Sequence, residues 1–206
     1  MVQTTYSGED STKRNDIIRA AQQRFGLYGL KKTSMMEIAN DLIMSKGLLY
    51  YYFPDKEHLY KAVVEKEMEE FKEKVADQIS TLTDPGQKLK EYVKLRLTYF
   101  RSLLNLSRFR LEEMQGIKSI MSNTWESVSK FEKGVIVDIL IKGNEQGVFS
   151  IQDPDEITDL LFDLLRGIRM AMIKDRQLFY LEQQDYELLV KRSEMLVDIF
   201  VKGLMA

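Results

Sequence analysis

The sequence predicts an all-α protein, and three observations support that fold class. Glycine and proline are sparse, with 11 and 3 among 206 residues. Alternation of the strand type, bounded by turn residues, is nearly absent, whereas apolar residues recur at helical spacing over long stretches. The chain has no cysteine, which excludes disulfides, thiol nucleophiles and cysteine-ligated zinc. We expect about nine helices, with three short ones at the N-terminus followed by longer ones.

The first helix is predicted to follow a frayed arm over residues 1–10. Ser11 or Thr12 can cap it, because a hydroxyl accepts a hydrogen bond from a free backbone N–H of the first turn. Gly29 fits the left-handed position that commonly ends a helix. One apolar stripe along this helix is formed by Ile18, Ala21, Phe25 and Tyr28.

The second and third helices are short and begin at recognisable caps. Thr33 or Ser34 can cap the second helix, and Glu37 stands at capping-box spacing from Ser34. Ser45 opens the third helix, which ends near Phe53 before a proline.

Longer helices are predicted for the rest of the chain. Asp55 caps a strongly charged fourth helix. The pairs Asp84-Pro85 and Asp153-Pro154 each place a capping carboxylate before a proline that can occupy the first helical position. The further helices are expected at about 85–104, 106–118, 122–146, 154–177 and 184–204.

Charge is distributed unevenly between the first quarter of the chain and the remainder. Residues 11–56 carry a net charge of +4, whereas the whole chain carries −2. A basic segment on an acidic body indicates that the segment meets an anion, although a basic segment alone is usually a solvated face.

The stretch "GLLYYYF", residues 47–53, carries the sharpest question about function. If Leu49 and Phe53 face the core, a rotation of about 100° per residue directs Gly47 and Tyr51 outward. Taken alone, such a run is more often core than surface. Three short helices with positive charge around them nevertheless match a helix-turn-helix reader, whose last helix enters the major groove of DNA.

A specific set of residues runs without a gap through residues 13–64. The set consists of Ala21, Phe25, Gly29, Thr33-Ser34, Ile38-Ala39, Ser45-Lys46-Gly47, Leu49-Tyr50, Tyr52-Phe53, Lys56-Glu57 and Leu59. It resembles the N-terminal DNA-binding region of the tetracycline-repressor (TetR) family. The resemblance implies a homodimer whose subunits each carry an N-terminal reader and a C-terminal domain that binds a small ligand and dimerises. It also implies repression that is relieved when the ligand binds.

The resemblance assigns DNA contacts by position. It places Lys46 and Tyr51 at base edges. Phosphate contacts or supporting positions fall to Thr33, Ser34, Ser45, Gly47, Leu48, Tyr50, Tyr52 and Lys56.

The sequence departs from the family pattern in two places. Leu42 and Ile43 stand in the turn where a small residue and then glycine are common, and a β-branched residue resists a positive φ. Leu48 stands where threonine is frequent, so it can only pack on a thymine methyl group or a sugar. We expect these departures to affect base preference.

The last two helices look suited to association, although their apolar bands could also be ordinary core. The resemblance favours a four-helix dimer interface, two helices from each subunit. The candidate interface residues are Leu160, Leu164, Gly167, Leu189, Leu196 and Phe200.

The middle helices are rich in methionine and aromatic residues, which line most ligand pockets. Each one alone is more often plain core. The candidates for contact with a hydrophobic or amphipathic ligand are Tyr92, Tyr99, Phe100, Met114, Met121, Trp125 and Phe162. An anionic ligand could pair with Arg108, Arg110, Arg166 or Arg169.

The sequence therefore favours a ligand-responsive repressor that binds a palindromic double-stranded DNA operator, with a reader over residues 1–56 and a ligand-binding and dimerisation domain over 57–206. A regulator without effector and a helical protein–protein module stay open as alternatives. We expect no catalytic residue, cofactor or metal, because nucleophile–base sets are missing and His58 lacks further ligands. A cytoplasmic protein without membrane contact is the default.

Overall fold

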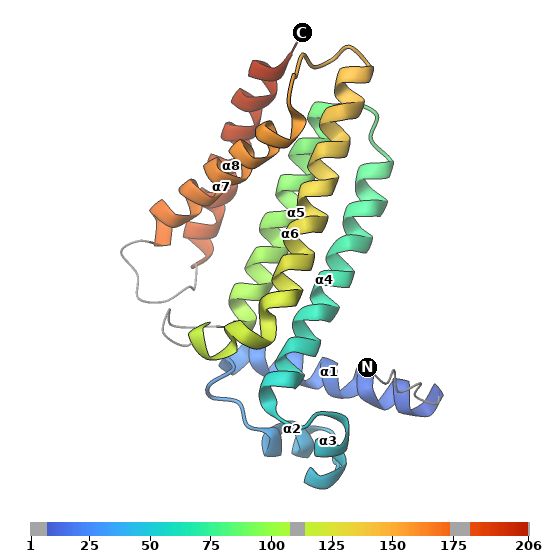
Figure 1. Ribbon diagram of the computed structural model, residues 1–206. Coiled ribbons are helices and arrows are strands. Elements are labelled where there is room, and N and C mark those ends of the chain that lie inside the picture. Colours follow the sequence, from blue (N-terminus) through green and yellow to red (C-terminus); the bar gives the residue numbers. More distant parts are fainter. Residues whose placement is uncertain (1–7, 108–113, 174–181, 206) are drawn as a thin grey trace.

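The computed structural model describes residues 8–107, 114–173 and 182–205, and it confirms the all-α fold class. It contains eight helices in these residues (Figure 1). They are α1 (Gly8–Tyr28), α2 (Met35–Asp41), α3 (Lys46–Tyr52), α4 (Lys56–Ser80), α5 (Pro85–Ser107), α6 (Met114–Glu145), α7 (Pro154–Ile173) and α8 (Gln183–Leu204).

The helix starts follow the predicted caps. The side chains of Ser34, Ser45 and Asp55 accept hydrogen bonds from backbone N–H groups at the starts of α2, α3 and α4. Asp84 and Asp153 accept from the N–H of Gln87 and Glu156 in the same way. These short-range signals hold because a cap is decided within one helical turn.

Two helix boundaries differ from the sequence prediction. The predicted helices over 106–118 and 122–146 are replaced by a single α6, because residues 117–123 contain neither glycine nor proline to interrupt it. The described residues therefore contain eight helices, where about nine were expected. Helix α1 begins earlier than predicted, at Gly8, and gains Asp10 near its positive N-terminal end.

The helices form a small unit and a longer body that share α4. Figure 1 shows α4, α5 and α6 side by side along the long axis, with α7 and α8 against one side and α1 to α3 at the end far from the C-terminus. The unit and the body have separate cores. The core of the small unit includes Ile17, Phe25, Ile38, Leu49, Leu59 and Met121, and that of the body includes Phe71, Tyr92, Leu140, Leu161 and Val197. Both α4 and α6 contribute residues to the two cores, so these helices connect the body to the small unit.

Candidate nucleic-acid interface

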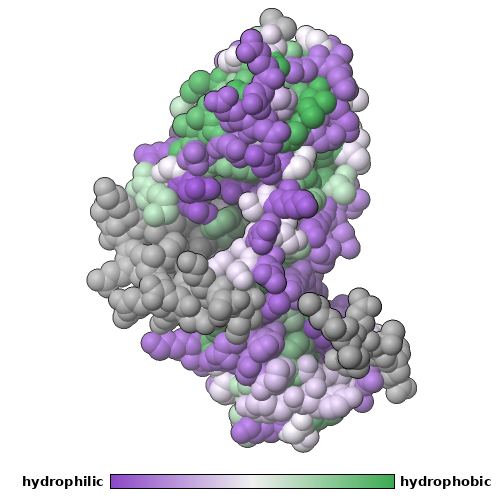
Figure 2. Space-filling model, viewed as in Figure 1, coloured by the Kyte–Doolittle hydropathy of each residue, from purple (hydrophilic) through white to green (hydrophobic). Residues whose placement is uncertain are grey.

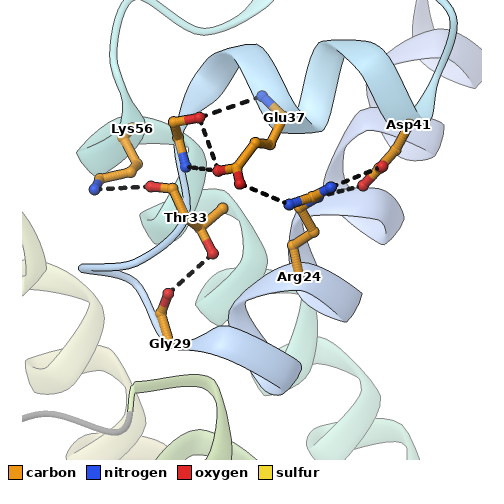
Figure 3. A network of polar contacts seen from close by, with 7 residues as sticks. Arg24, Gly29, Thr33, Glu37, Asp41 and Lys56 are labelled. Atoms are coloured by element: carbon orange, nitrogen blue, oxygen red, sulfur yellow. Dashed lines mark hydrogen bonds and ion pairs between the residues drawn. The ribbon is translucent and has the colours of Figure 1, made fainter.

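Arg24 of α1 fixes the position of α2 (Figure 3). Its guanidinium makes two hydrogen bonds to the carboxylate of Asp41, and its Nη1 lies 3.2 Å from Oε1 of Glu37. Glu37 also accepts from the backbone N–H of Ser34 at 2.8 Å, which completes the predicted capping box. The hydrogen bond from Arg24 holds the pKa of Asp41 below its usual range. Both ends of α2 are thus tied to the same arginine.

The loop between α1 and α2 is held by a hydrogen bond between two of its own residues. Gly29 adopts a φ of 81°, as expected for the residue that ends α1. The hydroxyl of Thr33 donates to the carbonyl of Gly29 at 2.9 Å, and Thr33 is buried (Figure 3). This corrects the expectation that Thr33 presents its hydroxyl to a phosphate, because that hydroxyl closes the loop instead.

Lys56, at the start of α4, is tied to the same loop. Its Nζ donates to the carbonyls of Leu30 and Thr33 at 2.9 and 3.0 Å. The sequence assigned Lys56 to a phosphate contact, and the structure gives its ammonium group a structural role. A phosphate contact by Lys56 stays a prediction.

The turn between α2 and α3 is built with Ile43 at a φ of 51°. The N–H of Met44 donates to the carbonyl of Ala39 at 3.0 Å, and that of Ile43 donates to Asn40 at 3.1 Å. This pattern is a Schellman motif, in which glycine normally occupies the left-handed position. Ile43 is strained there, because its branched side chain crowds the backbone at positive φ. Its side chain is 97% exposed, so packing offers no compensation.

Helix α3 has the predicted inner and outer faces. Leu49 and Phe53 are buried, whereas Tyr51 is 69% exposed and Tyr50 is also exposed. The ammonium of Lys46 lies 5.4 Å from the centre of the Tyr50 ring, one turn away, in a cation–π contact. An exposed aromatic and cationic helix face of this kind suits the edges and phosphates of a DNA groove.

Tyr52 differs from its two neighbours. Its ring is buried against the small unit, and its hydroxyl donates to Asp10 of α1 at 2.9 Å. The ring of Tyr51 stands edge-on to it, with centroids 5.3 Å apart. Tyr52 was predicted to contact phosphate, and the structure corrects this because helical phase turns its side chain toward α1. It supports Tyr51 from behind.

The remaining candidate DNA contacts are exposed. Ser34, Ser45 and Gly47 lie at the surface, and Leu48 is partly exposed beside them. The hydroxyl of Ser34 accepts from the N–H of Glu37 and donates to the Glu37 carboxylate, whereas the hydroxyl of Ser45 only accepts from the N–H of Leu48 and can still donate to a phosphate. The sequence reasoning overlooked Met36, which is exposed on α2 while Met35, Ile38 and Ala39 are buried. The same helical phase would have found it.

The candidate ligand residues fall into two places rather than one. Tyr92, Tyr99, Phe100 and Phe162 belong to the core of the body or pack against it. Met121 and Trp125 belong instead to the core of the small unit, so the structure corrects their assignment to the same pocket. The side chain of Met114, and Arg108 and Arg110, lie outside the described residues.

The outer face of α7 and α8 is apolar, and Figure 2 shows hydrophobic residues at the surface over this part of the molecule. We call it the α7–α8 face; it consists of Leu160, Leu164, Gly167, Ala171, Leu188, Met195 and Ile199. An added Cβ at Gly167 would meet no other atom within 4 Å, so no neighbouring helix of the chain approaches it.

The predicted interface residues of α8 are offset from this face. Leu189 is buried in the core of the body, and Leu196 and Phe200 are half-buried against it. The prediction for Leu189 is therefore corrected, because the apolar band of α8 is wide enough to cover both an inner and an outer side.

Neither a cluster of metal-ligating side chains nor a membrane-spanning helix occurs in the described residues. His58 pairs its Nδ1 with the capping carboxylate of Asp55 at 2.7 Å. The His, Asp and Glu side chains described here form no group of three placed to hold a metal ion. None of the described helices is long and apolar enough to cross a membrane.

Comparison with known proteins identifies this architecture. Residues 17–63 match the family model described as "Bacterial regulatory proteins, tetR family". The crystal structure of a transcriptional regulator from Cytophaga hutchinsonii is 37% identical, covers 94% of this chain and 99% of its own, and has a TM-score of 0.86. The chain belongs to the TetR family. It is therefore a helix-turn-helix transcriptional regulator, and its relatives are regulators rather than enzymes.

Other relatives have a lower sequence identity to this TetR-family regulator. The regulator RutR of Escherichia coli is 33% identical over 54% of this chain, and the chain spans about half (52%) of its length. A regulator from Saccharomonospora viridis, solved in complex with choline, shares the fold with a TM-score of 0.74 at 17% identity, over 95% of this chain and 99% of its own.

Proposed function

We propose that this regulator is a repressor that binds a palindromic operator as a homodimer and leaves it when a small molecule binds the helical body. The observation that carries the proposal is the outer face of α3, where Lys46, Tyr50 and Tyr51 are exposed together. An exposed pair of tyrosines gains nothing in water, whereas stacking and hydrogen bonding make it useful against DNA.

The two proposed functions are assigned to two parts of the chain. Residues 1–56 read DNA, with Lys46 and Tyr51 at base edges and Tyr50 near a phosphate. Residues 57–206 bind the effector and dimerise. The protein acts in the cytoplasm, where it reaches chromosomal DNA.

The dimer is proposed to form through the α7–α8 face. Ile199 is 67% exposed and Leu160, Leu164 and Met195 are exposed with it. A continuous apolar surface on two packed helices is typical of a subunit interface. A two-fold axis through this face would bring two α7–α8 pairs together as a four-helix bundle. Two readers related by that axis require inverted half-sites.

The decisive experiment is selection of bound sequences from genomic DNA, starting upstream of the protein's own gene, followed by footprinting. We expect a protected site with two inverted half-sites and an affinity that falls steeply with salt. A small-molecule screen for release from that site then tests the effector. Protection without sequence preference would overturn the proposal, and an operator that no compound releases would leave a regulator without effector.

A further inference from the structure

A cluster of polar side chains lies inside the helical body. Nε of Arg96 on α5 lies 2.5 Å from Oε1 of Glu132 on α6, and the hydroxyl of Tyr92 donates to the same oxygen at 3.1 Å. The side chains of this ion pair are only 17% and 12% exposed. The charge of Arg96 is therefore neutralised within the body.

Arg169 of α7 belongs to the same region and has no carboxylate partner among the residues that the structure describes. Its guanidinium carbon lies 4.1 Å from the centre of the Phe100 ring. Burial, and then the charges of Arg96 and Arg166, lower the pKa of Arg169 to about 10. A guanidinium that loses water beside like charges is stabilised by any anion that reaches it.

Arg166 provides an internal contrast, one helical turn before Arg169. Its side chain is exposed, and its Nη1 lies 3.5 Å from Oδ1 of Asp163. Arg96, Arg166 and Arg169 thus share a region, and the first two already have carboxylates. Of these three arginines, only Arg169 lacks a carboxylate partner within the described residues, which matches a ligand with one negative charge.

A second unpaired polar group lies on the same face of α5. The hydroxyl oxygen of Tyr99 is buried and has no hydrogen-bond partner among the residues that the structure describes. Its ring stacks on Phe71 of α4, with centroids 4.5 Å apart. Tyr92, Arg96, Tyr99 and Phe100 recur at the spacing that places them on one side of the helix.

We propose that this region binds a monocarboxylic acid with an apolar or aromatic body, whose carboxylate pairs with the guanidinium of Arg169. Phe100 and Phe162 provide the apolar wall, since the guanidinium groups of Arg169 and Arg96 lie over these two rings. The hydroxyl of Tyr99 is available to a second polar atom of the ligand. Arginine is suited to this task because its planar fork matches a carboxylate with two hydrogen bonds.

The proposal refines the proposed function by naming the effector class, and it opposes a cationic ligand. The choline found in the Saccharomonospora viridis regulator carries a positive charge. Such a ligand would be repelled by the guanidinium of Arg169, so we expect this regulator and that one to differ in effector chemistry despite a shared fold.

Binding is tested directly on the full chain, without DNA. Decanoate and 3-phenylpropionate are compared with their primary amides by thermal shift and calorimetry. We expect the acids to raise the melting temperature and the amides to fail at the same concentration. Arg169→Gln should weaken acid binding by about tenfold or more, while the matched variant Arg166→Gln keeps it. Tyr99→Phe should leave the carboxylate contact in place.

Three outcomes would overturn the inference: amides that bind as well as the acids, acids that bind Arg169→Gln unchanged, or no acid binding up to millimolar concentration. Arg169→Lys keeps the charge and serves if the glutamine variant fails to fold. Operator binding is measured separately on the selected site. If only neutral compounds release the protein from its operator, the acid effector class is refuted and the repressor function is supported. If acids bind but no operator is found, the effector class is supported and the repressor function is refuted.

Discussion

The small unit and the helical body differ in how their polar side chains are paired. In the small unit, Arg24 is paired with both Glu37 and Asp41, and Ser34 and Ser45 are bonded as caps. In the body, the buried hydroxyls of Tyr99 and Ser193 have no hydrogen-bond partner, and Arg169 has no carboxylate in the described residues.

This difference shows in which part of the molecule the polar groups find their hydrogen-bond partners within the same chain. A fully paired polar network holds one geometry, which suits a reading head that must meet a rigid groove. Buried polar groups without partners lower stability, and they persist where something else completes them. We infer that the small unit is built to present a fixed surface and that the body is built to be completed by a ligand and a second subunit.

Breaking the subunit contact should have the largest effect. Ile199→Glu places a charge on the α7–α8 face, where a partner helix would have to bury it. We expect a monomeric mass by light scattering at micromolar concentration and an operator affinity lower by about a hundredfold, since each reader then binds its half-site alone.

Ile141→Glu is the matched control for that experiment. Ile141 is also exposed but lies on α6, outside the α7–α8 face. It should keep the dimer and the operator affinity. A wild-type chain that is already monomeric at this concentration would refute the proposed interface.

The recognition surface is tested next by Tyr51→Ala. The loss of a side chain that reads a base edge should reduce discrimination between operator and random DNA by about 1–3 kcal/mol. Tyr28→Ala, which removes another exposed tyrosine at the end of α1, should leave discrimination unchanged. Equal weakening on both DNAs would show that Tyr51 does not read bases.

Lys56→Met separates a structural role from a phosphate contact. The variant keeps the apolar stem but removes the ammonium that bonds the carbonyls of Leu30 and Thr33. We expect the free energy of unfolding in urea to fall by about 1–2 kcal/mol, because two charge-assisted hydrogen bonds are lost. The salt dependence of DNA binding should stay the same.

Lys32→Met is the control, since Lys32 is exposed nearby. It should leave stability unchanged. If Lys56→Met instead keeps full stability and lowers the slope of log affinity against log salt by about one, Lys56 is a phosphate ligand after all.

The sequence predicted the small unit better than the body, for physical reasons. The caps at Ser34, Ser45 and Asp55, and the inward phase of Leu49, depend on neighbours within one or two turns. Thr33 and Tyr52 were misjudged because their partners, Gly29 and Asp10, lie across a loop or on another element. The contact of Lys56 with Leu30 was missed for the same reason.

The candidate sites of the body needed tertiary structure. The apolar band of α8 is so wide that the sequence does not reveal which side of the helix packs against the body. Leu189 was therefore predicted at the outer face, although it is buried. In the part of the chain that the structure describes, no carboxylate pairs with Arg169; this depends on how three helices meet, which no spacing along the chain reveals.

The smallest expected effect, and the only gain, is that of Ile43→Gly. The left-handed φ of 51° strains a branched side chain, and a non-glycine residue in this region costs roughly 1–2 kcal/mol. Glycine removes that strain but adds flexibility to the unfolded chain, so the net gain in the free energy of unfolding should be about 1 kcal/mol. Because the Ile43 side chain is almost fully exposed, no packing is lost. Urea titration measures the gain, and Ile43→Val, which keeps the branch, should show none. A less stable glycine variant would mean that contacts of the Ile43 side chain favour its strained conformation. The turn before α3 would then belong to a surface that binds a partner.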